Sequence, residues 1–387
     1  MNIQELDRQY IAGTYARFPL QLVKGKGSLV WDETGREYID LGGGIAVNTF
    51  GFADDAWAEA ISAQAQILQH TSNLYYSAPC VRLAEQLCLR TGMKKVFFSN
   101  SGAEANECAI KVARQYAAQK KGPEHHGILT LSGSFHGRTL ATLAATGQEV
   151  FHRHFQPLPE GFVSARTNDL EDVKRLLAKY KVAGILFEAV QGEGGVNPLD
   201  PEFVRGLADL AAQQDILLMA DEVQIGNGRS GALYGYMNYG VQPDVVTTAK
   251  GLGGGLPIGA TLLGEKAQDV LGPGMHGSTF GGNPVCCAGA LNILSRIDET
   301  LLAGVRERSG YIMDALTGAP GIRSVTGMGL MLGIETEKDS GQVISACMDR
   351  GVLVIRAKEK VRLLPALNIP TDLLKKAVDI IKGVCAE

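Results

Sequence analysis

The chain has 387 residues, of which 45% are hydrophobic and 20% are charged, and its formal net charge is -4 at pH 7. This composition is typical of a soluble globular protein, and the length favours two domains or one large and one smaller domain. The weak negative charge argues against nucleic acid or an anionic membrane as a partner. The sequence has no basic, apolar leader, and no run approaches the roughly 18 apolar residues of a membrane span. We therefore expect a cytoplasmic protein.

The N-terminal part of the chain predicts a β-hairpin, followed by alternating strands and helices. Residues 30–32 and 37–39 have the side chains of short strands, and Glu33-Thr34-Gly35 supplies the turn between them. Short apolar runs then recur between helical segments, at residues 96–99, 128–131, 183–190, 216–220, 245–248 and 258–263. Because these runs are apolar on both faces, they indicate a mostly parallel sheet covered by helices.

Helices are predicted between these strands and in the C-terminal third. Ser101 and Glu104 have the spacing of a capping box that opens a helix ending near Lys121, and two further helices are expected at residues 169–180 and 202–214. Beyond about residue 285, a helix is followed by short strands and a final helix, with the strands at 322–325, 331–334, 353–355 and 361–364. We therefore expect an α/β protein with a large domain at residues 49–281 and a small α+β domain at residues 282–387, which the N-terminal segment 1–48 joins.

The cysteines and histidines do not indicate a metal site. The seven cysteines contain no C-x-x-C pair, so we expect them to be reduced thiols. His152 and His154 could share one face of a strand, but no third ligand lies near them in the sequence. No metal is therefore expected.

A glycine pattern after residue 216 matches a dinucleotide-binding loop only in its spacing. Gly226, Gly228 and Gly231 have the G-x-G-x-x-G spacing and follow an apolar run. Such a loop needs a long helix at the third glycine, because the pyrophosphate lies at the N-terminus of that helix. Two glycines and a proline within the next 12 residues interrupt any such helix. An NAD-dependent oxidoreductase is therefore only a remote alternative.

Two groups of opposite charge follow two consecutive strands. Asp221 ends the run at 216–220, and Lys250 comes shortly after the run at 245–248. The carboxyl ends of parallel strands meet at one edge of a sheet, where ligands bind. A salt bridge at the sheet edge would explain the pair. A pyridoxal phosphate site would also explain it, because the cofactor needs a lysine for its aldehyde and an acid that keeps the pyridine nitrogen protonated. Desolvation of Lys250 would favour its free amine.

The helix that starts at Ser101 could hold the phosphate of such a cofactor. Asn100-Ser101-Gly102-Ala103 directly follows the run at 96–99, and free N–H groups with the helix dipole favour an anion there. Taken alone, the segment is more often an ordinary helix cap, and Glu104 would repel a phosphate unless it points back into the capping box. The cap, Asp221 and Lys250 at three strand ends together favour a cofactor site.

Eight stretches resemble the class III pyridoxal-phosphate aminotransferases, and the resemblance covers nearly the whole chain. They are HTSNLYYS (70–77), FFSNSGAEANECAIKVAR (97–114), SFHGRTLATLAATG (134–147), FEAVQGEGGVNP (187–198), ADEVQIGNGRSG (220–231), AKGLGGGLPIGA (249–260), HGSTFGGNP (276–284) and RLLPAL (362–367). The resemblance implies the type I fold of pyridoxal-phosphate-dependent transferases, with a mostly parallel seven-stranded sheet in the large domain, and a homodimer with shared active sites. HTSNLYYS together with GLMLGIE (329–335) favours N2-acetylornithine as the amino donor and 2-oxoglutarate as the acceptor, in arginine biosynthesis.

The resemblance also assigns roles around the cofactor ring. It implies that Lys250 is the Schiff-base lysine and carries the proton between the substrate carbon and C4′ of the cofactor. Asp221 would pair with the pyridine nitrogen, and Gln224 would hydrogen-bond the phenolic oxygen. Phe135 would stack on the ring, with a role as core filler as the alternative.

The phosphate and the loop after Asp221 receive assignments from the same resemblance. Gly102 and Ala103 would donate backbone N–H groups to the phosphate, and Thr279 would reach it from the partner subunit. Glu222 and Val223 are expected to contact the cofactor as well.

Four residues would bind substrate according to the resemblance. Arg138 would bind a substrate carboxylate, and Arg362 would bind the α-carboxylate of glutamate or 2-oxoglutarate, although a single arginine is more often a surface residue. Glu193 would neutralise Arg362 while the amino donor, whose reacting carbon bears no carboxylate, is bound. Ser278 would lie near the substrate.

The chain departs from the family pattern at residues 52–53 and, within a loop, at Asn227 and Ser230, and several donors stay open. Phe52 and Ala53 stand where a His-Pro pair is usual, which puts the local turn in doubt. Succinylornithine, ornithine, acetyl-lysine and 4-aminobutyrate are alternative donors for the same machinery. A non-catalytic binding protein is disfavoured because Lys250 is present.

Overall fold

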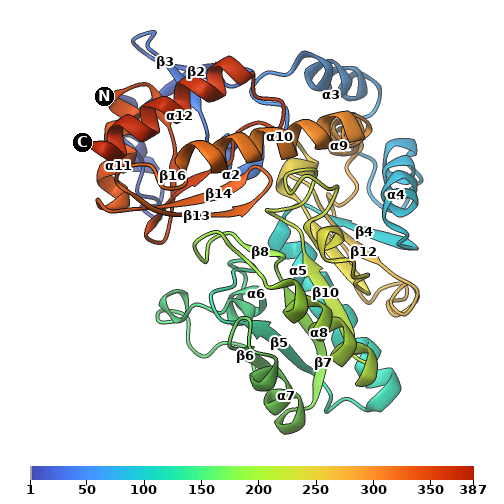
Figure 1. The fold of residues 1–387 in the computed structure, drawn as a ribbon. Helices are drawn as coiled ribbons and strands as arrows, with labels where there is room; N and C mark the ends of the chain where they lie inside the picture. Colours follow the sequence, from blue (N-terminus) through green and yellow to red (C-terminus); the bar gives the residue numbers. More distant parts are fainter. Residues whose placement is uncertain (1) are drawn as a thin grey trace.

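A seven-stranded sheet forms the centre of the larger part of the molecule (Figure 1). The computed structural model describes residues 2–387. Neighbouring strands are parallel except on the two sides of β12, so the sheet is mostly parallel, as predicted. In spatial order the strands are β4 (Lys95–Ser99), β12 (Gly259–Leu263), β11 (Val245–Thr248), β10 (Leu217–Asp221), β7 (Val182–Phe187), β5 (Gly127–Leu131) and β6 (Phe162–Ala165).

Helices cover both faces of this sheet, and side chains that alternate along each strand pack against them. Along β10, Leu217 and Met219 pack in a core with α5, whereas Leu218 and Ala220 pack in the core on the opposite face. Successive residues of a strand point to opposite faces, so both faces of a strand between helices must be apolar. The helices of this part are α3 (Asp55–Ile67), α4 (Ala78–Thr91), α5 (Gly102–Lys121), α6 (Leu140–Ala145), α7 (Leu170–Lys179), α8 (Pro201–Gln213) and α9 (Pro284–Ser295).

Short polar side chains set the starts of these helices. The side chains of Ser101, Asp169 and Asp200 each accept a backbone N–H group from the first turn of α5, α7 and α8. The capping box predicted at Ser101 forms only in part, because Glu104 accepts the N–H group of Asn100, at 2.8 Å, where a full box would use that of Ser101. The three predicted helices are confirmed.

The N-terminal strands pair with the C-terminal part of the chain. β2 (Leu29–Asp32) and β3 (Glu37–Asp40) form the predicted hairpin, and β3 pairs in parallel with β15 (Val352–Leu353). Figure 1 shows these blue strands beside the red C-terminal helices. The other elements of this part are α1 (Ile3–Tyr10), β1 (Leu22–Lys26), α2 (Gly43–Ala46), α10 (Glu299–Leu316), β13 (Ile322–Met328), β14 (Met331–Thr336), α11 (Ser340–Asp349), β16 (Ile355–Ala357), β17 (Lys360–Leu363) and α12 (Thr371–Ala386). The domain boundaries after residues 48 and 281 stay predictions.

Three local features differ from the sequence expectation. The run at 183–190 is not one strand, because β7 ends before Glu188 and the chain continues as a hairpin of β8 (Val190–Gln191) and β9 (Asn197–Pro198). The edge strand β6 has no counterpart among the predicted runs. Where Phe52 and Ala53 replace His-Pro, the N–H group of Phe52 donates to the carbonyl of Gly27 at 2.8 Å, and Ala53 takes a φ of 45°.

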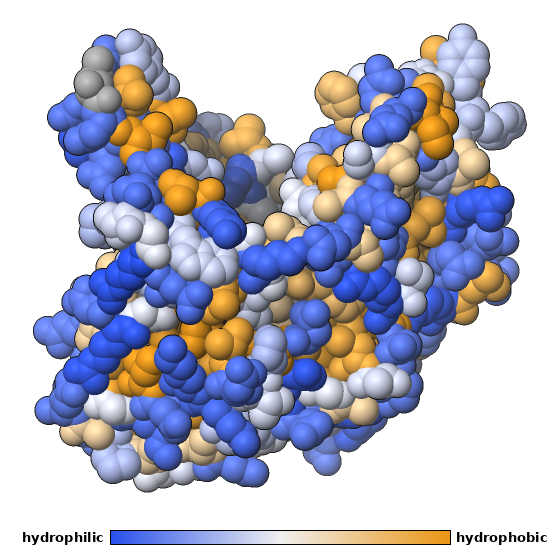
Figure 2. All heavy atoms as spheres, turned by 90° about the horizontal axis from the view of Figure 1, so that it is seen from above, coloured by the Kyte–Doolittle hydropathy of each residue, from blue (hydrophilic) through white to orange (hydrophobic). Residues whose placement is uncertain are grey.

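Seen from above, the surface is hollowed by a notch between two lobes, and hydrophobic residues reach the surface on both lobes (Figure 2). Within residues 2–387, no helix combines the length and the apolar character that crossing a membrane requires.

Candidate active site

A cavity of about 490 Å³ lies at the carboxyl ends of the parallel strands. Open α/β sheets bind ligands at this edge, because the loops that follow neighbouring strands converge there. The predicted site residues that line the cavity are Gly102, Ala103, Phe135, Arg138, Asp221, Val223, Gln224 and Lys250. The structure thus brings together side chains that lie up to 148 positions apart in the sequence, from residue 102 to residue 250.

Lys250 is held in the cavity by an unusual backbone conformation. It opens the short 3-10 helix η3 (Lys250–Leu252) with a φ of 45°, which is uncommon for a residue other than glycine and is typical of functional sites. Thr49 and Asn227 fix the neighbouring carbonyl groups, with Thr49 Oγ1 2.7 Å from the oxygen of Gly251 and Asn227 Nδ2 3.1 Å from that of Ala249. Burial lowers the pKa of the Lys250 amine, although the carboxylates of Glu193 and Asp221 oppose this shift. Burial therefore shifts the equilibrium of this amine toward its uncharged form.

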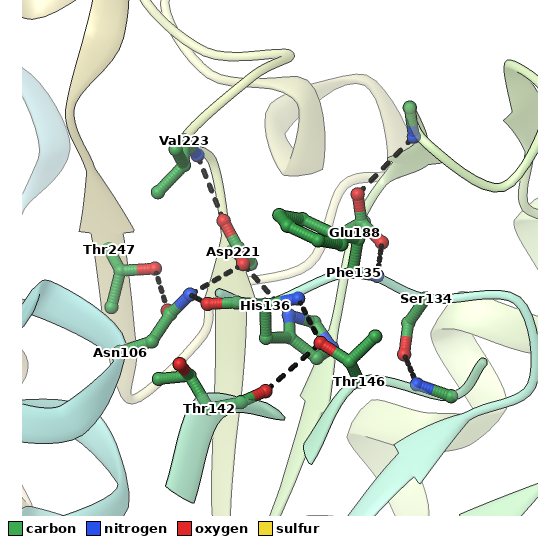
Figure 3. Close-up of polar contacts among 12 residues, drawn as sticks. Asn106, Ser134, Phe135, His136, Thr142, Thr146, Glu188, Asp221, Val223 and Thr247 are labelled. Atoms are coloured by element: carbon green, nitrogen blue, oxygen red, sulfur yellow. Dashed lines mark hydrogen bonds and ion pairs between the residues drawn. The ribbon is translucent and has the colours of Figure 1, made fainter. Parts of the chain in front are cut away.

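Asp221 ends β10 with three hydrogen bonds to its carboxylate (Figure 3). Oδ2 accepts from Asn106 Nδ2 at 2.7 Å and from His136 Nδ1 at 2.8 Å, and Oδ1 accepts from the N–H group of Val223 at 3.0 Å. A carboxylate only accepts hydrogen bonds, so His136 carries its proton on Nδ1. These donors compensate the burial of the charge and fix the orientation of the carboxylate.

Glu188 is a second buried carboxyl group in the cavity wall, directly after β7. It accepts the N–H group of Phe135 at 2.9 Å and that of Gly192 at 3.3 Å (Figure 3). Burial raises the pKa of Glu188 to about 7, although the nearby His136 lowers it. The carboxyl group of Glu188 thereby connects the loop that carries Phe135 to the loop that carries Glu193.

Sequence reasoning missed Asn106, His136 and Glu188. Glu188 had a usable signal, because it is the one charged residue in the otherwise apolar run at 183–190. Asn106 lies one turn into α5 and His136 lies next to Phe135, so both positions become informative only when the fold places them against Asp221.

The start of α5 faces the same cavity. N–H groups in the first turn of a helix have no partner within the helix, so those of Gly102 and Ala103 are suited to bind an anion. A Cβ atom on Gly102 would lie 2.6 Å from Val223 Cγ1, so only glycine allows this close approach of helix and loop. The carboxylate of Glu104 turns back to the N–H group of Asn100, which removes the expected repulsion of a phosphate.

A hydrogen-bonded group of three side chains lies beside the cavity and consists of Arg362, Glu193 and Gln224. Of these, Gln224 also lines the cavity. Arg362 Nη1 lies 2.6 Å from Glu193 Oε1 and 2.9 Å from Gln224 Oε1, and Gln224 Nε2 donates to Glu193 Oε1 at 3.2 Å. Burial raises the pKa of Glu193, but the Arg362 guanidinium outweighs this and holds the pKa below its usual value. The arginine charge is therefore neutralised by a neighbouring acid.

Besides Arg362 and Glu193, three further predicted residues do not line the cavity: Glu222, Thr279 and Ser278. The buried carboxyl group of Glu222 accepts the N–H groups of Gly235 and Tyr236 at 2.6 and 2.8 Å, which fixes the 3-10 helix η2 (Gly235–Tyr239). Thr279 lines a separate cavity of about 160 Å³, and Ser278 Oγ accepts from Asn100 Nδ2 at 3.1 Å.

The alternatives to this site gain no support. Among residues 2–387, no group of three His, Cys, Asp or Glu side chains could hold a metal ion, and the seven cysteines are free. The glycine loop at 226–231 is a series of turns and leads into η2, which is only five residues long. A helix that could carry a pyrophosphate does not follow it.

Comparisons with known proteins agree with this geometry. Residues 10–385 match the family described as aminotransferase class-III. The acetylornithine aminotransferase of Haemophilus ducreyi is 47% identical over 387 residues, which are 100% of this chain and 98% of that protein. The structure of N-acetylornithine aminotransferase from Stenotrophomonas maltophilia is 34% identical with a TM-score of 0.85, and the match covers 99% of this chain and 98% of that one. An ornithine aminotransferase from Toxoplasma gondii, whose active site holds PLP at partial occupancy, is 30% identical with a TM-score of 0.94 over 99% of this chain and 93% of that one. The chain belongs to the class III aminotransferases.

Proposed function

We propose that this enzyme transfers the δ-amino group of N2-acetylornithine to 2-oxoglutarate, forming N-acetylglutamate 5-semialdehyde and glutamate in arginine biosynthesis. The observation that carries this choice of donor is the 47% identity, over the full chain, with an acetylornithine aminotransferase. Likeness of fold does not select the donor, because the ornithine aminotransferase has a higher TM-score than the N-acetylornithine aminotransferase.

Pyridoxal 5′-phosphate is the cofactor, and the cavity residues fit it. When bound, the cofactor supplies an aldehyde that bonds to amines and a ring that withdraws electrons from the reacting carbon. The cavity offers a buried amine with a lowered pKa at Lys250, a fixed carboxylate at Asp221 and free N–H groups at Gly102 and Ala103. These are the three groups that an aldehyde, a pyridine nitrogen and a phosphate require.

The roles of the residues around the ring follow from their chemistry. Lys250, whose amine pKa is lowered by burial, acts as nucleophile and moves a proton at its Nζ atom. Asp221, held by Asn106 and His136, would accept a hydrogen bond from the protonated pyridine nitrogen. Phe135 and Gln224 line the cavity, where Phe135 would cover a face of the ring and exclude water, and Gln224 would hydrogen-bond the phenolic oxygen.

Two arginines handle the carboxylates of the substrates. Arg138 at the cavity wall binds the carboxylate of the amino donor, and Arg362 binds the α-carboxylate of 2-oxoglutarate. Glu193 neutralises Arg362 in the half-reaction whose substrate lacks a carboxylate at the reacting carbon, and leaves it in the other. Ser278 lies near the substrate.

The active enzyme is a homodimer that works in the cytoplasm. Large apolar side chains are exposed near the cavity of Thr279, with Leu74 87%, Tyr76 99% and Phe280 60% exposed. An exposed apolar patch of this kind marks a protein interface, and a second copy of the chain would cover it. In that arrangement Thr279 would reach the phosphate in the partner's site.

A comparison of donors tests this function. The holoenzyme is mixed with N2-acetylornithine, succinylornithine, ornithine, acetyl-lysine or 4-aminobutyrate, and kcat/KM is measured for each with 2-oxoglutarate as acceptor. We expect the highest kcat/KM for N2-acetylornithine. A higher value for another donor would reassign the substrate but not the class of reaction, and an absence of transfer from every donor would overturn the proposal.

A further inference from the structure

The guanidinium group of Arg138 is held by aromatic rings. It lies 4.3 Å from the ring centroid of Phe151 and 5.5 Å from that of Phe135. The two rings meet edge to face, with centroids 5.8 Å apart. Within residues 2–387, no hydrogen bond or ion pair joins the Arg138 side chain to another residue. Its position at the cavity wall therefore depends on the rings, and Phe151 is the nearer.

Phe151 is itself fixed in place. It ends the 3-10 helix η1 (Glu149–Phe151), and its own N–H group donates to the carbonyl of Gln148 at 3.1 Å. The next residue, His152, lies with Nε2 2.8 Å from the carbonyl oxygen of Leu143 in α6, which ties this turn to the body of the molecule. The ring is half-buried against Phe135. The ring of Phe151 thus gives the Arg138 guanidinium a fixed surface to pack on.

Holding an arginine by its face has a specific chemical consequence. A cation over an aromatic ring is attracted by the electrons of the ring, and this contact uses none of the five N–H donors at the guanidinium edge. An acidic partner would occupy those donors, as Glu193 does for Arg362. In the part of the chain that the structure describes, the N–H donors of Arg138 are therefore unoccupied and available for a bidentate bond to a carboxylate.

We infer that Phe151 determines donor specificity, because its ring holds the Arg138 guanidinium in the position from which it binds the carboxylate of the amino donor. This inference rests on the proposed role of Arg138. Phe151 is a positioning residue, since it acts on the donor through Arg138. The two arginines are thus controlled differently: Arg362 is covered by an acid that leaves, and Arg138 is held uncovered by a ring.

The test compares two donors that differ only in the carboxylate. N2-acetylornithine and its decarboxylated counterpart, N-acetyl-1,4-diaminobutane, are given to the wild-type holoenzyme and to the variants Phe151→Leu, Phe151→Tyr and Arg138→Gln. Phe155→Leu is the matched control, because Phe155 lies four residues further along the same loop with 52% of its surface exposed. Thermal unfolding and the visible band of the bound cofactor check that each variant folds and binds its cofactor.

The specificity ratio is kcat/KM for the carboxylated donor divided by kcat/KM for the decarboxylated donor. In Phe151→Leu we expect this ratio to fall roughly 3- to 10-fold. The fall should come from a higher KM for the carboxylated donor. Phe151→Tyr should restore the ratio, and Phe155→Leu should leave it as in the wild type. If Arg138→Gln lowers the ratio and Phe151→Leu does not, the inference about Phe151 is overturned and the role of Arg138 stands. If Arg138→Gln itself leaves the ratio unchanged, both are overturned.

Discussion

Replacing Glu193 with glutamine tests the proposed control of Arg362. The carboxylate of Glu193 lies 2.6 Å from the buried guanidinium, so glutamate or 2-oxoglutarate must displace it before binding there. A hydrogen bond between two charged groups contributes about 1.5–3 kcal/mol, roughly twice the value of one with a neutral partner. Glutamine keeps the size and one acceptor but loses the charge, so the competition weakens by about 1–1.5 kcal/mol. This corresponds to about a tenfold lower KM for glutamate.

The assay isolates one half-reaction. Holoenzyme is mixed rapidly with a range of glutamate concentrations without an acceptor, and the change in cofactor absorbance gives the rate and KM. The same experiment with N2-acetylornithine should show no such gain, because its reacting carbon bears no carboxylate. Glu359→Gln is the control, since Glu359 is an exposed acid with a salt bridge to Arg356 on the same sheet. A KM for glutamate that is unchanged or higher in Glu193→Gln would refute the reasoning.

Three further predictions concern the residues that support the site. Burial raises the pKa of Glu222 from 4.5 to about 8, so its neutral form stabilises the fold fully below about pH 4.5 and this stability is lost as the pH rises through 8. The Tm of the wild type should therefore fall more between pH 5 and pH 8 than that of Glu222→Gln, and parallel Tm curves would contradict this. Gly102→Ala should weaken cofactor binding at least tenfold in an equilibrium titration, because its Cβ would lie 2.6 Å from Val223 Cγ1, and wild-type affinity would show that the helix start moves freely. His136→Leu removes one donor from Asp221 and should lower kcat about 10- to 100-fold with little change in KM; an unaltered kcat would show that Asn106 alone suffices.

The strand ends could be predicted because apolar runs are local signals. The runs before Asp221 and Lys250 identify two strands, and the edge-of-sheet rule then brings their ends together, as the shared cavity confirms. The turn chemistry at 33–35 and the helix cap at Ser101 are local in the same sense. These features depend on residues within a few positions of one another.

The residues that the sequence did not place depend on side-chain direction or on distant contacts. Glu222 follows Asp221 directly, yet adjacent residues at a strand end point to opposite faces, and Glu222 bonds η2 while Asp221 faces the cavity. Because side chains alternate between the two faces of a strand, the sequence could have assigned Asp221 and Glu222 to opposite faces. The contacts of Asp221 with Asn106 and His136 join residues 115 and 85 positions apart, and no local pattern indicates them.

The central claim is that Lys250 and Asp221 serve one cofactor ring from the ends of neighbouring strands. The most direct measurement is borohydride reduction of the yellow holoenzyme, followed by proteolysis and mass analysis of the peptides. The mass of the reduced cofactor should appear on the peptide that contains Lys250 and on no other, and a Lys250→Ala variant should retain no covalent label. Labelling of a different lysine, or a wild-type protein without label, would contradict the account.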